Sequence, residues 1–321
     1  MWTDQLKINP IPTLLDGEDK ALQYFTERDL LGLEVETAGE ALWELKAPVE
    51  ILRRQRMDGA WVYRGNRPGD EFGENYELLE TWKNLRFLVE MYGFDRRHAA
   101  IQRAADFIFA CQTREGDIRG ILANQYMPYY MGTIMEILIK AGYGEDERIH
   151  KGFQWLLDMR QADGGWIIPL QLYKIQEFYR VYNRAPIPPE KNKPFSHMAS
   201  GMVIRAFAAH AEYGRRPEAQ HAGRLLKGRM FQADVYTSRQ AIAYWYKLQF
   251  PFWWTSLLTV LDSLMRMDFI LDDEIRQGLD WFIQNQDHDG TWHTSYGGLK
   301  GTRPTGWVTL AVCRILKHYL P

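Results

Sequence analysis

The chain has 321 residues, of which 46% are apolar and 14% aromatic, enough for one large core or two small ones. Its formal charge is −2, from 39 basic and 41 acidic residues, which gives no electrostatic reason to expect nucleic acid as a partner. No apolar run reaches about 18 residues, and the N-terminus lacks a basic stretch followed by an apolar one, so we expect no transmembrane segment and no signal peptide.

The N-terminal segment 1–39 contains one helical pattern, "DKALQYFTERDLLG", and we expect it to be a helical extension of the domain. From about residue 40 onward, amphipathic segments alternate with segments that are apolar nearly all round, such as "MGTIMEILIKAGY" and "TGWVTLAVCRIL". A helix that is apolar on every side must be covered on most sides. The alternation therefore predicts half-exposed outer helices paired with buried inner helices.

A short motif recurs between the members of each pair. It begins at Gln55, Gln112, Gln161 and Gln286 and reads "QRMDGAW", "QTREGDI", "QADGGW" and "QDHDGTW"; a degenerate copy at Gln232 has lost the glycine and the tryptophan. Glycine can adopt the positive φ that ends a helix, and the acid can cap backbone N–H groups. The glutamine amide can bond free backbone groups, and tryptophan can cover the turn. We interpret these residues as structural.

Five such hairpins predict an all-α protein. We expect a single domain, residues 1–321, in which five to six helical hairpins close into an α/α-toroid, with an open helical solenoid as the alternative. Cys111 and Cys313 lie in apolar helical patterns, which predicts two buried, reduced thiols and no cysteine-based zinc site. We expect a cytoplasmic protein without a metal or another cofactor.

The motifs "QRMDGAW", "QADGGW" and "QDHDGTW" resemble the QW-type repeats of squalene and hopene cyclases, whose toroid is shared by the β subunits of protein prenyltransferases. The resemblance runs from about residue 40 to the end, and the chain looks most like the short, single-domain squalene-cyclase-like proteins. It implies an enzyme that acts by acid–base chemistry on an isoprenoid or other largely apolar substrate. The substrate would lie in a central, aromatic-lined cavity.

The chain departs from both families. The acidic DxDD cluster of the cyclases is absent, and the nearest acidic pair, Asp272 and Asp273, begins an outer helix, where it favours the helix N-terminus. Cys313 has no aspartate two residues before it, so the zinc site of the prenyltransferases is not reproduced. Neither family's activity is therefore carried over directly.

In a toroid, the first turns of the inner helices surround one mouth of the ring. Three residues there are candidate catalytic groups: His197, Tyr130 and Glu80. Burial could tune the pKa of His197, Tyr130 could donate a proton or orient a substrate, and Glu80 is the best-placed single acid. For each, a purely structural role is the alternative.

Further residues are candidates for substrate binding. They are Tyr129, Trp253, Trp254, Trp307, Arg303 and Asp262. Asp262, like Glu136, is a charge inside an apolar helix, and because a lone buried carboxylate is costly we expect it to pair with a cation or to face the cavity. The aromatic-rich stretch 244–254 predicts either core packing or a wall for an apolar ligand.

Residues 167–195 form the longest insertion. Its second half is rich in proline, and its first half carries the helical pattern Leu172, Ile175, Phe178, Tyr179 and Tyr182. The positions of Tyr173, Phe178 and Tyr179 test whether it covers the ring. We expect it to be a lid over His197, with an excursion packed on the outer ring as the alternative.

The expected partner is a small apolar or isoprenoid-like ligand, with no nucleic acid. Peripheral membrane contact and the oligomeric state stay open. Two other functions compete with the isoprenoid enzyme: a carbohydrate lyase or hydrolase, and a non-catalytic protein that binds a hydrophobic ligand.

Overall fold

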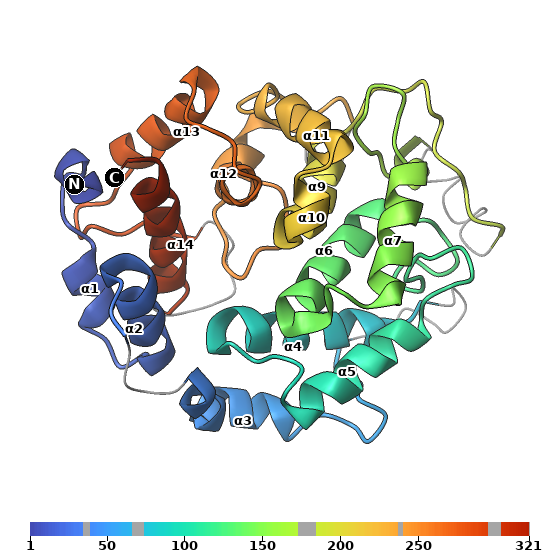
Figure 1. Cartoon of the computed structure of the whole chain (residues 1–321), viewed down its shortest axis with the longest axis horizontal. Helices are drawn as coiled ribbons and strands as arrows, with labels where there is room; N and C mark the ends of the chain where they lie inside the picture. The colour runs from blue at the N-terminus through green and yellow to red at the C-terminus, as the bar shows by residue number, and fades with distance from the viewer. Residues whose placement is uncertain (35–38, 66–73, 173–183, 237–239, 295–302, 321) are drawn as a thin grey trace.

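The computed structural model describes residues 1–34, 39–65, 74–172, 184–236, 240–294 and 303–320. Within these ranges the secondary structure is helical, and the β-type pairings are isolated bridges, such as the one between Gln55 and Trp61. The helices form two concentric layers around one axis (Figure 1). The predicted all-α toroid is confirmed.

The inner layer of the described chain contains six helical segments. They are α2 (Lys20–Thr26) with the π-helical turn η2 (Glu27–Leu31), α4 (Tyr76–Tyr92), α6 (Pro128–Leu138) with the π-helical turn η5 (Ile139–Tyr143), α9 (His197–Ala209), α12 (Leu257–Arg266) and α14 (Arg303–Tyr319). Each packs on the next, and α14 packs on α2, so the ring closes. Every residue of α6 is buried, as expected for an inner helix.

The outer layer consists of helices that are partly exposed. They are α1 (Ile11–Leu15), α3 (Lys46–Leu52), α5 (Ala99–Ala110), α7 (Glu147–Asp158), α11 (Pro217–Lys227) and α13 (Asp273–Gln284). One-turn or two-turn pieces complete the described chain: η1 (Trp2–Gln5), η3 (Gly39–Glu44), η6 (Pro169–Leu172), α10 (Ala211–Gly214) and η7 (Ile242–Tyr246). In α5 the buried side chains recur at helical spacing and face the inner layer, which confirms the predicted amphipathic pattern.

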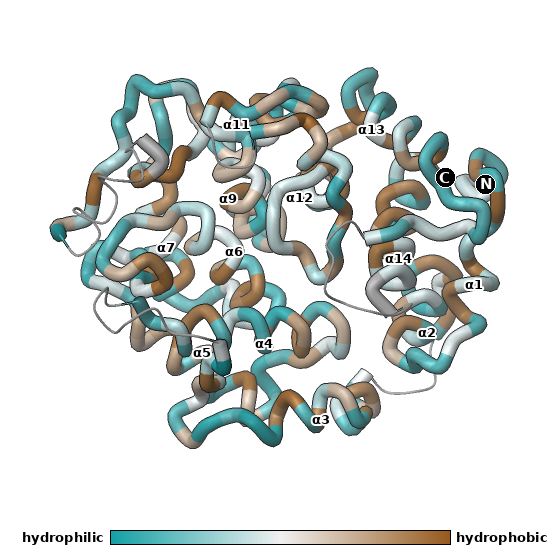
Figure 2. Tube along the Cα trace, turned by 180° about the vertical axis from the view of Figure 1, so that it is seen from behind, coloured by the Kyte–Doolittle hydropathy of each residue, from teal (hydrophilic) through white to brown (hydrophobic). Residues whose placement is uncertain are grey.

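The N-terminal segment is part of the ring. Asp19 accepts a hydrogen bond from the backbone N–H of Leu22, which caps α2, and a second from Trp307 Nε1 of α14 at 3.1 Å. Arg314 of α14 is bonded to Asp29 of η2. The N- and C-termini consequently lie side by side, as both views show (Figures 1 and 2). The helix predicted as an extension closes the inner layer.

The glutamines of three turn motifs, Gln55, Gln112 and Gln286, join neighbouring repeats. Gln55 Nε2 donates to the carbonyl of Gly59 in its own turn at 3.0 Å and to that of Ala100, in the first turn of α5, at 2.8 Å. Gln286 Nε2 donates to Gly290 O at 2.9 Å and to Ile8 O at 2.7 Å. The last motif therefore ties the end of the outer layer to its beginning, and the predicted role of the glutamine amide is confirmed.

The tryptophan of the motif bonds both layers. In Trp61, Trp166 and Trp292, the indole N–H donates to a carbonyl ten residues earlier, near the end of the preceding outer helix, and the backbone N–H donates to a hydroxyl on the following inner helix. The carbonyls belong to Ile51, Leu156 and Phe282, and the hydroxyls to Thr81, Ser200 and Thr309. The motif is thus explained by the fold.

Gly59 gives a sharp test of this turn. Its φ is +89°, and a Cβ there would lie 2.0 Å from the carbonyl oxygen of Arg103. We expect Gly59→Ala to lower the free energy of unfolding by about 3 kcal/mol, because the left-handed strain of about 1–2 kcal/mol adds to a backbone clash. Gly32→Ala is the matched control, since Gly32 has a φ of +68° and open space around it. Equal losses in urea titrations of the two variants would contradict this account.

Candidate functional site

The segment from residue 248 to 254 lies between the inner helices. The carbonyl oxygen of Phe252 accepts hydrogen bonds from Arg86 Nη1 of α4 at 2.8 Å and from Arg205 Nη2 of α9 at 3.0 Å. Arg205 Nη1 also donates to the carbonyl of Trp253 at 2.8 Å. Phe250 and Phe252 are buried and Trp253 is half-buried, so this part of the aromatic stretch serves largely as core.

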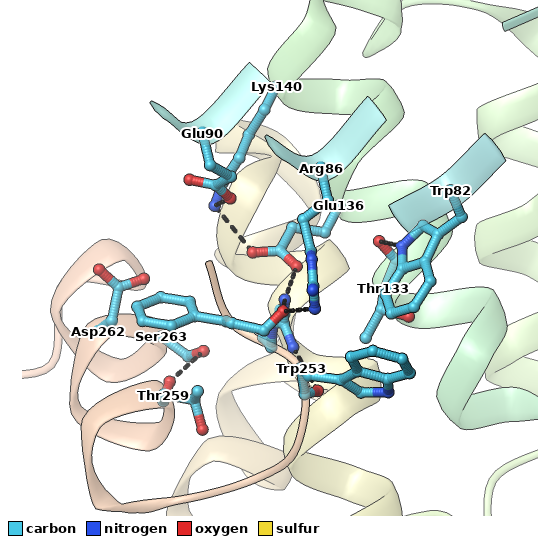
Figure 3. Close-up of polar contacts among 12 residues, drawn as sticks. Trp82, Arg86, Glu90, Thr133, Glu136, Lys140, Trp253, Thr259, Asp262 and Ser263 are labelled. Carbon is cyan, nitrogen blue, oxygen red and sulfur yellow. Dashed lines mark hydrogen bonds and ion pairs between the residues drawn. The ribbon is translucent and has the colours of Figure 1, made fainter. Parts of the chain in front are cut away.

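Arg86 packs against two indole rings that contact each other. Its guanidinium carbon is 4.9 Å from the ring centroids of both Trp82 and Trp253 (Figure 3). Burial, and then the charge of Arg205, lower the pKa of Arg86 to about 9, which still leaves it protonated at neutral pH. These two aromatic faces, which could otherwise stabilise a cation on a ligand, already hold a cation of the protein.

Glu136 of α6 joins the same cluster from the opposite side. Its carboxylate lies 2.5 Å from Arg205 Nη2 and 2.8 Å from Lys140 Nζ, and Lys140 is in turn 2.6 Å from Glu90 of α4. Burial alone would raise the pKa of Glu136, but Arg205 and Lys140 hold it well below its usual range. The predicted pairing of this carboxylate with a cation is confirmed, and Glu136 stays ionised.

Asp262 of α12 also pairs with a cation, Arg266, at 2.8 Å. Arg266 lies one turn later on the same helix. A second ion pair, between Arg314 of the neighbouring α14 and Asp29 of η2, has an N–O distance of 2.5 Å. These groups lie toward the C-terminal ends of the inner helices, where the partial negative charge of free carbonyls favours cations. We call this end of the ring the C-terminal mouth.

A cavity of about 440 Å³ opens at the C-terminal mouth. Its apolar wall consists of Phe25, Val89, Phe94 and Met265. Its charged wall consists of Arg28, Asp29, Glu90, Asp95, Lys140, Arg266 and Arg314. The cavity therefore combines an apolar surface with a larger set of charged groups, which come from five of the inner segments and from the loop after α4.

The structure places His197 in the first turn of α9, at the other end of the ring. It is buried, its Nε2 lies 3.8 Å from the Asp234 carboxylate, and its ring packs on Trp245 with centroids 4.6 Å apart. Burial lowers the pKa of His197 although Asp234 opposes the change. The imidazole is therefore neutral at pH 7.

Four of the other candidates meet in one row of aromatic rings. Tyr129 contacts Tyr130 with centroids 4.6 Å apart, and Tyr130 meets Trp82 edge-on at 5.6 Å. Trp82 contacts Trp253 at 5.2 Å, and Trp253 stacks on Trp254 at 5.8 Å. Trp82 links the row and was not singled out from the sequence. Arg86 contacts the middle of the row, at Trp82 and Trp253, so the row is continuous with the charged cluster.

Glu80 lies apart from this row. It is bonded to Lys83 at 3.0 Å and to Asn84, and it lines a separate cavity of about 280 Å³ with Arg53 and Trp61. Trp307 stacks on Phe250, so its described contacts are those of a core residue. The side chain of Arg303 lies outside the described residues.

Tyr173, Phe178 and Tyr179, on which the lid prediction depends, also lie outside the described residues. The described residues 184–195 of the insertion are bonded to two loops. Ile187 N–H donates to Gln125 Oε1 at 3.1 Å, and Gln161 Nε2 donates to the carbonyls of Glu190 and Lys193. This half is held against the surface near the third turn motif.

The charged cluster at the C-terminal mouth was largely missed from the sequence. A signal for it exists, because Arg86–Glu90, Glu136–Lys140 and Asp262–Arg266 are opposite charges four residues apart within apolar inner helices. On an exposed helix such pairs are ordinary. On three buried helices they predict that the charges converge at one end of the ring.

In the parts of the chain that the structure describes, no group of three or more His, Cys, Asp or Glu side chains is placed to hold a metal ion. No described helix is both long and apolar enough to cross a membrane.

No protein-family model matches the chain, and no curated protein matches it. Solved structures do resemble it. The type II terpene cyclase MstE from Scytonema, in its apo form, is 12% identical over 84% of this chain and 95% of that chain, with a TM-score of 0.33. A protein from Actinoplanes is 15% identical over 84% and 96%, with a TM-score of 0.32. A variant of MstE with geranylgeranyl dihydroxybenzoate is 13% identical over 84% and 94%, with a TM-score of 0.34.

Proposed function

We propose that the chain is a terpenoid-cyclase-like toroid that binds a small, largely apolar, isoprenoid-like molecule bearing an anionic end at the C-terminal mouth. The observation that carries this proposal is the cavity of about 440 Å³ there, with its apolar wall and its charged wall. The apolar wall would cover the hydrocarbon part of the ligand. The charged wall would hold its polar end.

The charges favour an anionic end over a cationic one. Four cations line the cavity, Arg28, Lys140, Arg266 and Arg314, against three carboxylates, Asp29, Glu90 and Asp95, which leaves an excess of one positive charge. Arg28 and Arg266 are partly exposed, but Lys140 with Glu90 and Arg314 with Asp29 are largely buried, and buried groups of ionised residues are seldom the most stable way to fill a core. Their presence at the wall of a cavity therefore favours a role in binding.

Binding is favoured over proton-initiated cyclisation at this end of the ring. An alkene is protonated by a strong, protonated acid, whereas Glu136 is kept ionised by Arg205 and Lys140. Acid–base catalysis at the other end of the ring is the second candidate. It is favoured by one observation, the buried and neutral His197 at 3.8 Å from Asp234.

Isothermal titration calorimetry with farnesoic acid, and with farnesol as its uncharged counterpart, tests the proposal. We expect farnesoic acid to bind more tightly than farnesol. Val89→Phe, which fills the cavity without changing its charge, and Lys140→Met should each weaken the binding of farnesoic acid by roughly tenfold, or about 1.4 kcal/mol. Lys193→Met, at an exposed lysine of the insertion, is the matched control.

Two outcomes would overturn the proposal. One is the absence of heat for both ligands with the wild-type protein. The other is equal affinity of the wild type and Val89→Phe for farnesoic acid. The removal of Lys140 could also weaken the fold, so the melting temperature of every variant is measured alongside the titrations. If Lys140→Met melts at a lower temperature than the wild type, the result with Val89→Phe decides the test.

A further inference from the structure

A second cavity of about 440 Å³ lies on the outer layer, along α13. Phe231, Tyr246 and Trp281 line it together with polar side chains of α13. We call it the outer groove. It shares no lining residue with the cavity at the C-terminal mouth, so it is a separate site.

The three aromatic residues of the outer groove form a ladder. Phe231 and Tyr246 have ring centroids 6.0 Å apart and planes inclined by 30°, and Tyr246 and Trp281 are 5.0 Å apart and inclined by 20°. All three side chains are half-buried. Because the rings are stacked, each covers part of its neighbour's face, and the ladder leaves ring edges and its two outermost faces for contact with a ligand. Rings that are already held in place lose little entropy when a ligand binds.

The backbone is strained where this ladder begins. Phe231 has a φ of +63°, a left-handed conformation that bulky residues rarely adopt. Phe231 directly precedes Gln232, which begins the degenerate copy of the turn motif, the one that lacks the glycine and the tryptophan. Trp245 Nε1 donates instead to the carbonyl of Gln232 at 2.7 Å, and this places the adjacent Tyr246 against Trp281 of α13. The repeat that departs from the pattern is therefore the one that builds the ladder.

The polar wall of the outer groove is a single stripe of α13. Asp273, Gln277, Asp280 and Gln284 recur at helical spacing, and Arg276 pairs with Asp280 at 2.8 Å. The stripe covers eleven residue steps, or roughly 16 Å at 1.5 Å per residue. Carboxylate, amide and guanidinium groups are planar and make two hydrogen bonds side by side, which suits adjacent hydroxyl groups on a ligand.

We propose that the outer groove binds a neutral oligosaccharide. One face of a pyranose ring presents C–H groups that pack on aromatic rings, and its edge presents hydroxyls that both donate and accept hydrogen bonds. The ladder and the polar stripe supply these two complements. Two carboxylates against one guanidinium leave the groove with one excess negative charge, which disfavours acidic sugars and phosphates. Its length suits several sugar units rather than one.

Ligand-observed saturation-transfer NMR and calorimetry with hexasaccharides derived from cellulose, xylan, mannan and starch test the proposal. We expect at least one to bind the wild type. Trp281→Ala and Gln277→Ala should weaken that binding by about tenfold and about fivefold. The matched control is Tyr63→Ala, which removes another stacked tyrosine, whose ring centroid lies 5.0 Å from that of Tyr76. We expect this variant to bind the sugar as tightly as the wild type does.

The exposed Gln277 keeps the test valid if Trp281→Ala fails to fold. The proposal is wrong if no hexasaccharide binds the wild type, or if Gln277→Ala and the folded Trp281→Ala variant bind as tightly as the wild type. It is also wrong if the groove pairs with a second copy of the chain. In that case the wild type would dimerise with increasing concentration, Trp281→Ala would not, and no sugar would bind. None of these outcomes bears on the binding of farnesoic acid.

Discussion

Glu136→Leu is expected to lower the free energy of unfolding by about 3–5 kcal/mol, the loss typical of a buried ion pair that has lost one partner. Glu136 is 2% exposed and lies within 2.8 Å of two cations, Arg205 and Lys140. With the carboxylate gone, two positive charges would face each other in a poorly solvated place, with Arg86 close by. Urea denaturation followed by circular dichroism measures the loss.

Two comparisons isolate the charge as the cause. The double variant Glu136→Leu with Arg205→Met should be more stable than Glu136→Leu alone, because it removes one of the uncompensated cations. Glu212→Leu, which breaks the exposed pair with Arg216, should change stability by no more than about 0.5 kcal/mol. A Glu136→Leu variant as stable as the wild type would contradict the role of the cluster.

The same variant should change the response to acid. The pKa of Glu136 in the folded protein lies below its ordinary value of 4.5, so the folded state binds fewer protons than the unfolded state. The stabilisation from its ionised form is therefore present above pH 4.5 and is lost as the pH falls through and below that value. Glu136→Leu should lose less stability than the wild type between about pH 5 and pH 3.

Trp292→Ala should cost about 3–5 kcal/mol, the usual loss when a buried large aromatic side chain is truncated. Trp292 is 1% exposed, and its indole N–H donates to the carbonyl of Phe282 at 2.9 Å. Its backbone N–H is bonded to Thr309 of α14, so the cavity would open where the last turn meets the inner ring. Thermal and urea unfolding both report this loss.

Trp292→Phe is the graded control, because it keeps most of the apolar contact and removes the indole donor. It should cost clearly less, about 1–2 kcal/mol. His293→Ala, at the exposed neighbouring position, should be nearly neutral. If Trp292→Ala unfolded at the same urea concentration as the wild type, the structural account of the turn motif would be wrong.

The fold was predictable because its signals are local and repeated. A glycine at positive φ, an acid that caps the turn and a helix apolar on all sides each leave a pattern within a few residues, and the turns at Gln55 and Gln286 show the bonds that the pattern indicates. The place of α2 in the ring was not predictable in this way. Its partner Trp307 is 288 residues away in the sequence, and no local pattern reports such a contact.

The candidate site was predictable only in part. Tyr129, Tyr130, Trp253 and Trp254 were nominated for their place near one mouth of the ring, and the structure does bring them together. Trp82, which joins them, looks like any core residue in the sequence. Whether the charged side chains meet at the C-terminal mouth depends on how far each inner helix is shifted along its axis relative to its neighbours. That register is set by packing between helices rather than by residues close in the chain.

The closure of the ring by α14 and α2 also bears on the order of events during synthesis. About 270 residues separate the end of η2 from the start of α14. At roughly 5–20 residues per second, a ribosome needs about 14–54 s to make that interval. Throughout it, the faces of α2 that Trp307 and Arg314 will cover have no partner. The first inner helix of this sequence to leave the ribosome is thus among the last to be fully covered, because the face that packs on α14 stays without its partner until α14 has been synthesised.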